Sequence, residues 1–394
     1  MPIEIGAVQK ALQAEGLDGW LLYDFQGSNP VASRLAAGPV KGGHLSTRRW
    51  FYLIPATGEP KALVHAIERH NLDHLTGTTT VYAGRMQLES GLAHLLSGLT
   101  RVAMEYSPLC AIPYVSRVDA GTVELVRGHG IEVVSSGDLI QQFEARWSPA
   151  AIASHRLASE KLHRIKDRAF EAVASRLRGG VPTTEFDIQQ LMVGWFRDEA
   201  LVAESAPNVS AQENAGNPHY LPTAAQHRAI RPNELLLIDL WGKLTTPGAV
   251  YADITWIAYT GPTVPAEMTR AFAAICGARD AAVAVVQDAA KAGREVRGFE
   301  ADRAARAVIE GAGFGAAILH RTGHSLGENV HGDGAHLDDY ETHDERRLLP
   351  GSGFTVEPGV YFARFGMRTE VNVVWADHGP EVTGPLQQSI VTLA

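Results

Sequence analysis

Two aspartates that interrupt apolar, strand-like runs constrain how this chain of 394 residues can fold. Asp239 lies within the run 235–240, and Asp253 lies in the next such run, 251–256, 14 positions later. A carboxylate in an apolar strand is costly to bury unless another group compensates its charge. An antiparallel hairpin would bring the two side chains close together, where a shared cation relieves their repulsion. The alternatives are a salt bridge to an arginine, or a strand end that turns out to solvent.

A glycine-laced segment downstream, residues 320–331, adds three histidines: His320, His324 and His331. Two further acids follow, Glu357 immediately before Pro-Gly and Glu370 in a strand-like run. Imidazole and carboxylate ligands together are typical of a divalent metal that supports hydrolysis, not of a structural thiolate site. A lone histidine is more often an ordinary surface or core residue, so the indication comes from the whole set.

An arginine accompanies the last acid of the set. Arg368 lies two positions before Glu370, and the alternation of a continuous strand would place both side chains on one face. The four acids and His324 offer enough oxygen and nitrogen ligands for two divalent ions about 3.5–4 Å apart that share bridging carboxylates. This oxygen-rich set favours manganese, with cobalt or zinc as the alternatives.

The length of the chain and its pattern of elements predict two domains. In residues 1–148, short apolar runs at 19–23, 50–54, 62–65, 102–105 and 131–134 alternate with helix-like segments, which indicates an α/β domain. A long helix begins after Pro149 and ends at Gly179-Gly180, and it opens the second domain, residues 149–394. Further strands at 235–240, 251–259, 354–356, 367–375 and 389–393 combine with helices at 185–195, 265–290 and 299–311 to give that domain an α+β character.

Charge and hydropathy exclude several classes of protein. The net charge of -9 argues against a nucleic-acid binder, whose binding face would be basic. The sequence contains no run of about 18 apolar residues, so it predicts no membrane span, and the N-terminal residues do not resemble a signal peptide. We therefore expect a cytoplasmic protein. The two cysteines, Cys110 and Cys276, lie far apart, and we expect both to be reduced and buried.

The order of these residues and their local contexts resemble a known family. Asp239, Asp253, His324, Glu357 and Glu370 look like the five metal ligands of the pita-bread metallopeptidases, which include methionine aminopeptidase, aminopeptidase P and prolidase. The segment from Gly323 to His331 is similar to the family's Gly-His-x-x-Gly-x-x-x-His signature, and residues 355–361 are similar to its Glu-Pro-Gly segment. Residues 1–148 resemble the creatinase-type α/β domain of the prolidase and aminopeptidase P branch.

The resemblance implies a role for each residue. Asp253 and Glu370 would bridge the two ions, Asp239 would complete one site, and His324 and Glu357 the other. Glu357 would also move the proton of the attacking water. His219 and His331 would hydrogen-bond the substrate and the developing oxyanion, and Arg368 would orient a metal-binding aspartate. His320 would either contact the substrate or brace its loop.

The resemblance also implies a substrate, a small peptide with proline at its second position. We expect an Xaa-Pro dipeptidase that acts as a homodimer, with an aminopeptidase P that takes longer peptides as the nearest alternative. A metal-free peptide-binding module is the third alternative, although it leaves five retained ligands without a use. A dipeptidase needs a cation for the C-terminal carboxylate of its substrate. We expect Arg48 or Arg49, behind a glycine-rich loop at residues 37–46, to supply it, either as part of a substrate lid or beside a disordered surface loop.

Overall fold

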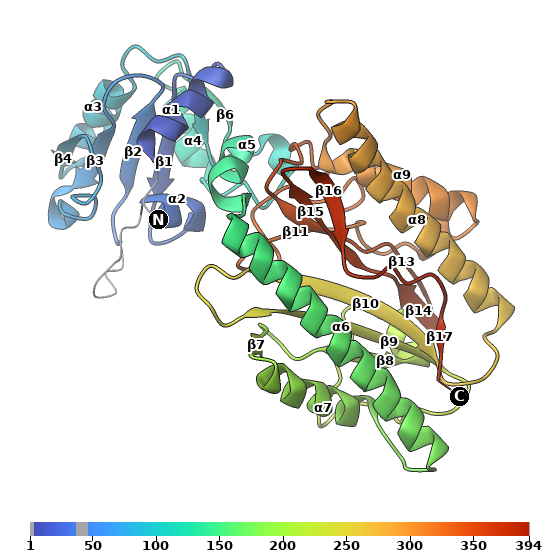
Figure 1. The fold of residues 1–394 in the computed structure, drawn as a ribbon. Coiled ribbons are helices and arrows are strands. Elements are labelled where there is room, and N and C mark those ends of the chain that lie inside the picture. Colours follow the sequence, from blue (N-terminus) through green and yellow to red (C-terminus); the bar gives the residue numbers. More distant parts are fainter. Residues whose placement is uncertain (1–3, 37–45, 394) are drawn as a thin grey trace. The chain divides into compact units, whose positions relative to one another are not determined.

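The computed structural model describes residues 4–36 and 46–393, and within them the chain forms two compact units, Met1–Phe143 and Glu144–Ala394 (Figure 1). The units divide between Phe143 and Glu144, whereas the sequence predicts a domain boundary at 148/149. Most of the glycine-rich loop, residues 37–45, lies outside the described residues. The assignment of one catalytic and one creatinase-like domain to these ranges stays a prediction.

The N-terminal unit is built on a mixed sheet in the order β4-β3-β2-β1-β5-β6. Its strands are β1 (Gly19–Asp24), β2 (Trp50–Pro55), β3 (Lys61–His65), β4 (Thr78–Tyr82), β5 (Arg101–Met104) and β6 (Glu132–Ser135). Along β1, Trp20 and Leu22 enter one hydrophobic core while Leu21 and Tyr23 enter another, so both faces of the sheet are apolar. Helices cover both faces: α1 (Ile5–Ala14), α2 (Pro30–Ala36) and α5 (Gly137–Ile140) pack on one core, and α3 (Arg85–Leu96) and α4 (Ala120–Arg127) on the other.

Two expectations for this unit are corrected. Strand β4 is not among the predicted strands, because its threonine-rich sequence is almost entirely exposed and lacks an apolar pattern. Cys110 is exposed rather than buried, since it lies in a short turn in which Leu109 and Cys110 both have positive φ. Cys276 is buried, and both cysteines are free.

The C-terminal unit begins with the long helix α6 (Pro149–Arg178), followed by α7 (Glu185–Asp198). The Ser148 hydroxyl caps α6 by accepting a hydrogen bond from the Ala151 N–H at 3.1 Å. Thr184 begins α7 with a capping box, in which the acidic partner is Asp187. Figure 1 shows α6 running along β9 and β10, the strands that carry both aspartates.

The strands of this unit form two main sheets and a hairpin in the described part of the chain. One sheet has the order β17-β10-β9-β7 with β8 also pairing with β9, the other has the order β11-β12-β15-β16, and β13 pairs with β14. The strands are β7 (Leu201–Val202), β8 (Asn208–Ala211), β9 (Leu235–Leu244), β10 (Ala252–Tyr259), β11 (Ser325–Leu326), β12 (Gly353–Val356), β13 (Gly359–Phe362), β14 (Phe365–Arg368), β15 (Val371–Ala376), β16 (Gly379–Thr383) and β17 (Val391–Thr392). Helices α8 (Ala266–Lys291) and α9 (Gly298–Gly311) pack against the second sheet.

Alternation along β9 and β10 determines where the polar residues point. On β9, Leu236, Ile238 and Leu240 belong to the core shared with α6 and α7, whereas Leu235 and Leu237 belong to the core between the sheets and α8. Asp239 therefore shares the face of Leu235 and Leu237. The antiparallel register places Asp239 opposite Thr255 and Asp253 opposite Trp241, so the predicted hairpin is confirmed.

The strand predicted at 367–375 is wrong. The chain instead leaves β14 at Arg368 and begins β15 at Val371, and β14 pairs with β13 whereas β15 pairs with β12 and β16. Arg368 and Glu370 therefore do not share a face of one strand, and the alternation argument for them fails. No helix in the described residues combines the length and the apolar character that crossing a membrane requires.

Candidate metal centre

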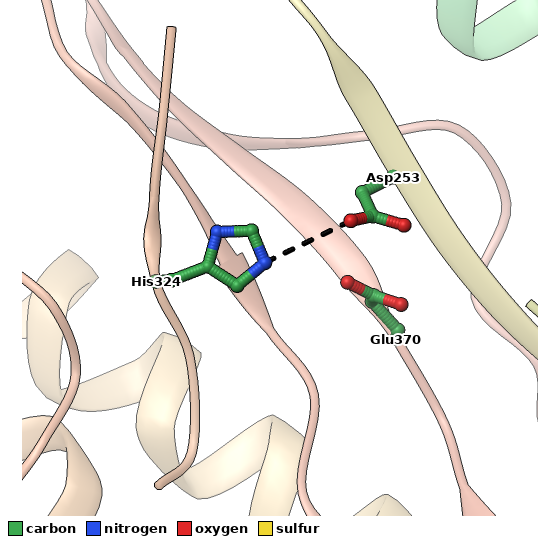
Figure 2. A group of neighbouring side chains, drawn as sticks. All are labelled: Asp253, His324 and Glu370. Atoms are coloured by element: carbon green, nitrogen blue, oxygen red, sulfur yellow. Dashed lines mark ion pairs between the residues drawn. The ribbon is translucent and has the colours of Figure 1, made fainter. Parts of the chain in front are cut away.

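Three buried side chains from distant parts of the C-terminal unit converge in this structure. Asp253, His324 and Glu370 each offer a ligand atom, and these atoms all lie within 4.8 Å of one another. Figure 2 shows the His324 ring directed at the Asp253 carboxylate, with Glu370 beside it. The His324 Nε2 atom lies 3.7 Å from Asp253 Oδ2. One imidazole and two carboxylates at this spacing form a ligand set suited to a divalent cation.

The position of His324 depends on the glycine before it. A Cβ atom on Gly323 would lie 2.1 Å from the Thr355 carbonyl oxygen, so only glycine allows the two backbones to approach this closely. The His324 N–H donates to Thr355 Oγ1 at 2.9 Å, and the Thr355 N–H donates to the His324 carbonyl at 2.8 Å. The Glu357 N–H donates to the Thr322 carbonyl at 2.7 Å, which holds the Glu-Pro-Gly segment against the segment that carries His324.

Neighbouring polar groups orient the two acids of this cluster. The Thr255 hydroxyl donates to Glu370 Oε2 at 2.7 Å, and the Glu370 N–H donates to the Thr255 carbonyl at 3.2 Å. The Asn372 side chain accepts the Asp253 N–H at 3.0 Å and donates to the Asp253 carbonyl. Strand β10 is therefore tied to the segment that carries Glu370 at several points.

The remaining two acids are connected to the cluster through His324 and Arg368. Glu357 Oε1 lies 3.4 Å from His324 Nε2, and Glu357 Oε2 lies 3.7 Å from Arg368 Nε. The Arg368 guanidinium forms an ion pair with Asp239. Arg368 also donates to Thr255 Oγ1 at 3.0 Å and to the Tyr361 hydroxyl at 2.8 Å.

The electrostatics of this region favour a bound cation. Burial raises the pKa of Asp253 well above its usual value, and the Glu370 carboxylate raises it further. Burial likewise raises the pKa of Glu370, with Glu357 adding to the effect. Burial also raises the pKa of Asp239, although Arg368 opposes that shift. Four acids, Asp239, Asp253, Glu357 and Glu370, lie near Arg368, and Arg321 acts on Glu357 as well, so the ionised carboxylates carry excess negative charge in a buried place.

Glu357 behaves differently from the other acids. Burial raises its pKa, but the charges of His324, His320, Arg368 and Arg321 together lower it more, and the net pKa is below the usual value. Burial lowers the pKa of His324 to about 4, so its imidazole is neutral at pH 7. A neutral imidazole and ionised carboxylates are the protonation states that metal ligation needs.

An unsatisfied atom provides a direct test of whether a cation fits. Asp253 Oδ1 is buried and has no hydrogen-bond partner among the described residues, 4–36 and 46–393. A buried carboxylate oxygen without a partner is strongly unfavourable unless a cation or water takes that place. The residues present therefore fit a divalent metal ion, which Asp253, His324 and Glu370 would hold.

The other sequence-predicted residues lie at different distances from this cluster. The His331 ring is centred 4.3 Å from the His324 ring and is exposed. His219 is also exposed and is close enough to His331 for their charges to interact. Both ring nitrogens of His320 are engaged, Nδ1 with the Arg321 carbonyl at 2.6 Å and Nε2 with the Tyr361 hydroxyl at 2.7 Å, which favours its bracing role.

The two candidate carboxylate-binding arginines belong to the N-terminal unit. Arg48 is exposed, and its guanidinium donates to the Thr47 carbonyl at 3.1 Å and to Thr47 Oγ1 at 3.2 Å. The Arg49 carbonyl accepts a hydrogen bond from the Tyr82 hydroxyl at 2.8 Å. Their part in substrate binding stays a prediction.

Sequence reasoning did not identify several residues that position this cluster. Thr255 lies two positions after Asp253 on the same face of β10, so strand alternation could have found it. Tyr361 belongs to the quoted Glu-Pro-Gly segment, but its contacts with Arg368 and His320 depend on the β13–β14 hairpin. Asn372 contacts a residue 119 positions away, and local patterns carry no signal for such a pairing.

Comparison with known proteins identifies relatives of this arrangement. Residues 158–377 match the metallopeptidase family M24. An Xaa-Pro dipeptidase of Lactobacillus delbrueckii subsp. lactis is 32% identical over 206 residues, which are 52% of this chain and 51% of that protein. The crystal structure of dipeptidase PepE from Mycobacterium ulcerans is similar with a TM-score of 0.68 at 22% identity, over 99% of this chain and 96% of that one. Recombinant prolidase from Thermococcus sibiricus gives a TM-score of 0.60 at 20% identity, over 98% of each chain.

The comparisons differ in what they cover. The aligned part spans about half the length of the curated relative, 51% of it. The two solved structures match nearly the whole chain, and at identities of 22% and 20% they show that the fold is shared. The predicted fold class, an α/β N-terminal domain followed by a pita-bread α+β domain, is confirmed.

Proposed function

This chain belongs to the metallopeptidase family M24, since the family match covers residues 158–377, and from that premise we propose that it is an Xaa-Pro dipeptidase. It would hydrolyse the peptide bond before proline in dipeptides. The observation that carries the proposal is the convergence of Asp253, His324 and Glu370, with one Asp253 oxygen left without a partner among the described residues. The similarity to an Xaa-Pro dipeptidase over half of the chain supports the substrate class.

The proposed metal site uses all five predicted ligands. Asp253 and Glu370 would be shared between two divalent ions, Asp239 would complete one site, and His324 and Glu357 the other. Bound ions would supply Lewis acidity that lowers the pKa of water and polarises a carbonyl oxygen. The oxygen-rich ligand set favours manganese over cobalt or zinc.

The protein's own groups would handle protons and orientation. Glu357 has a lowered pKa, so it is ionised at neutral pH and can accept the proton of the attacking water. Arg368 would keep Asp239 in place through their ion pair, and Tyr361 and Thr255 would hold that arginine. The exposed rings of His219 and His331 are available to donate hydrogen bonds to the substrate and to the developing oxyanion.

Several finer features remain part of the proposal. Residues 149–394 would form the catalytic domain and residues 1–148 the creatinase-like domain. Arg48 or Arg49 would bind the C-terminal carboxylate of the dipeptide and so exclude longer peptides. A homodimer and a cytoplasmic location stay predictions from the sequence.

The experiment that tests this function compares three substrates, Ala-Pro, Ala-Pro-Ala and Ala-Ala, with added Mn²⁺. We expect hydrolysis of Ala-Pro, with little activity on the other two. Preferential release of alanine from Ala-Pro-Ala would instead identify an aminopeptidase P, and no activity on any of the three would contradict both.

Two sets of variants assign the residues. Glu357→Gln keeps the shape of the side chain but removes the base, and kcat should fall by about 10²–10⁴-fold. Arg48→Ala and Arg49→Ala test selectivity. If neither variant changes the ratio of Ala-Pro to Ala-Pro-Ala hydrolysis, the proposed carboxylate-binding role is wrong.

A further inference from the structure

A cavity of about 540 Å³ lies between α6 and the segment that ends β16, and no step of the proposed hydrolysis uses it. We call it the α6–β16 pocket. It is lined on the α6 side by residues 156–164 and on the other side by residues 381–385. Its His163 ring meets the Trp256 ring edge-on, with centroids 5.8 Å apart. Trp256 packs against the α6–α7 core, on the face of β10 opposite Asp253 and Thr255, so this pocket is separate from the metal cluster.

The floor of the pocket contains buried polar groups that the protein does not satisfy. His163 is 8% exposed and Ser159 is 2% exposed. The two ring nitrogens of His163 and the hydroxyl of Ser159 have no hydrogen-bond partner among the residues that the structure describes. Leaving such groups unpaired inside a protein is unfavourable, so a bound molecule that hydrogen-bonds with them is favoured.

A glycine makes room for these groups. The Cβ position of Gly384 would lie 2.4 Å from His163 Nε2 and 3.2 Å from Ser159 Oγ, so both polar atoms border the space that a side chain would fill. Burial and, to a lesser degree, the charge of the nearby Lys166 lower the pKa of His163 to about 4. The ring is therefore neutral at pH 7, with one N–H to donate and one nitrogen to accept. A molecule that pairs with this floor needs both a donor and an acceptor.

Charges of both signs surround the opening. Arg156 is paired with Glu381, and Arg164 is paired with Glu199 at 2.9 Å, which leaves both guanidinium groups with further N–H donors. Glu160 is exposed, and its charge interacts with that of Arg164 one helical turn away, although the two form no direct ion pair among the described residues. The acids disfavour a phosphate-like anion, and the arginines disfavour a free metal cation. A small molecule that carries one positive and one negative group can pair with the acids and with the arginines of the rim.

We propose that the α6–β16 pocket binds a free α-amino acid as its zwitterion. Its ammonium group would pair with Glu160, and its carboxylate would accept hydrogen bonds from the arginines of the rim. The buried floor of Ser159 and His163 would take up the remaining polar contacts. The volume is within the range of small-molecule sites.

Isothermal titration calorimetry on the full chain tests this directly. The probes are glycine, L-proline, L-leucine, L-glutamate and L-lysine, with acetate, methylamine and inorganic phosphate as probes that are not zwitterions. We expect saturable binding of at least one amino acid and no comparable binding of the other three. A pocket that holds only water would give no saturable heat with any amino acid, and this would overturn the proposal.

Two variants locate the binding. Glu160→Gln removes the exposed charge at constant shape, and Ser159→Ala removes the buried hydroxyl. Each should weaken binding about tenfold or more, as expected for the loss of a charge-assisted or buried hydrogen bond. Glu171→Gln, an exposed substitution on the same helix away from the pocket, is the matched control and should bind as the wild type does.

Peptide hydrolysis by the same variants controls for folding and for binding at the metal cluster. None of these side chains touches the metal cluster, so kcat should be unchanged in all three variants. If Glu160→Gln and Ser159→Ala bind the amino acid as tightly as the wild type, the amino acid binds elsewhere and the proposal is wrong.

Discussion

Replacing Thr255 by valine probes the arrangement around the metal cluster without replacing any of the proposed metal ligands. The Thr255 hydroxyl donates to Glu370 Oε2 at 2.7 Å and accepts from Arg368 Nε at 3.0 Å, and its side chain is fully buried. Valine has nearly the same shape but no hydroxyl. Thr255→Val therefore leaves one oxygen of Glu370 and one nitrogen of Arg368 without this partner.

The size of the effect can be estimated in two ways. A hydrogen bond to a charged group is worth about 1.5–3 kcal/mol, and loss of the bond between Thr255 and Glu370 removes one that orients a ligand. Loss of an outer partner of a metal ligand lowers metal affinity by about 10–100-fold, which corresponds to roughly 1.4–2.8 kcal/mol. The two estimates agree, so we expect the Kd for Mn²⁺ to rise by about 10–100-fold.

Calorimetric titration of the metal-free chain with Mn²⁺ measures this affinity. Thr255→Ser is the matched control, because it keeps the hydroxyl and removes only a methyl group, and its Kd should stay within a few-fold of the wild-type value. Equal Mn²⁺ affinity in Thr255→Val and the wild type would refute the view that this hydroxyl orients Glu370.

Three further predictions follow from burial and close packing. His155 is fully buried, and burial lowers its pKa from 6.5 to about 4. Its contribution to the free energy of unfolding is therefore fully present above pH 6.5, where the ring is neutral in both the folded and the unfolded chain, and it is lost as the pH falls toward 4. At pH 5 the free energy of unfolding should be about 2 kcal/mol lower than at pH 7.5 because of this residue. Urea unfolding at the two pH values should therefore show a smaller decrease in the free energy of unfolding for His155→Gln than for the wild type. Gly323→Ala should lower the thermal midpoint of the metal-free chain by an amount equivalent to about 1–3 kcal/mol, because the new Cβ would meet the Thr355 carbonyl oxygen; an unchanged midpoint would contradict the close approach. Since the raised pKa values of Asp253 and Glu370 make their ionised forms unfavourable without a cation, the rise in thermal midpoint on adding Mn²⁺ should be larger at pH 8 than at pH 5.5, and an equal rise would argue against these carboxylates.

Local patterns in the sequence predict much of the fold. The apolar run around Asp239 and the next one around Asp253 predict the hairpin of β9 and β10, because strand periodicity and a short connection are local properties. The helix from Pro149 to Arg178 is predicted by the proline at its start, its apolar spacing and the glycines after it. Strand β4 is missed because an exposed edge strand has no buried face to leave an apolar signature.

The details of the site depend on contacts that the sequence does not encode locally. The break between β14 and β15 places Arg368 and Glu370 in different strand pairs, and it arises from pairing with β13 and β12 rather than from the residues at the break. The partner of Asp239 also depends on tertiary structure, since Arg368 is 129 positions away. The sequence therefore identifies the candidate site residues, whereas the contacts between them follow from the packing of the two sheets.

The number of Mn²⁺ ions bound per chain tests the central claim most directly. Mass-spectrometric metal analysis of the dialysed protein, run beside an Ala-Pro hydrolysis assay, should give two ions for the wild type and a clear loss of both metal and activity in Asp253→Asn. Exhaustive chelation should abolish hydrolysis, and readdition of Mn²⁺ should restore it. A wild type that binds no stoichiometric metal, or that hydrolyses Ala-Pro undiminished after chelation, would contradict the account.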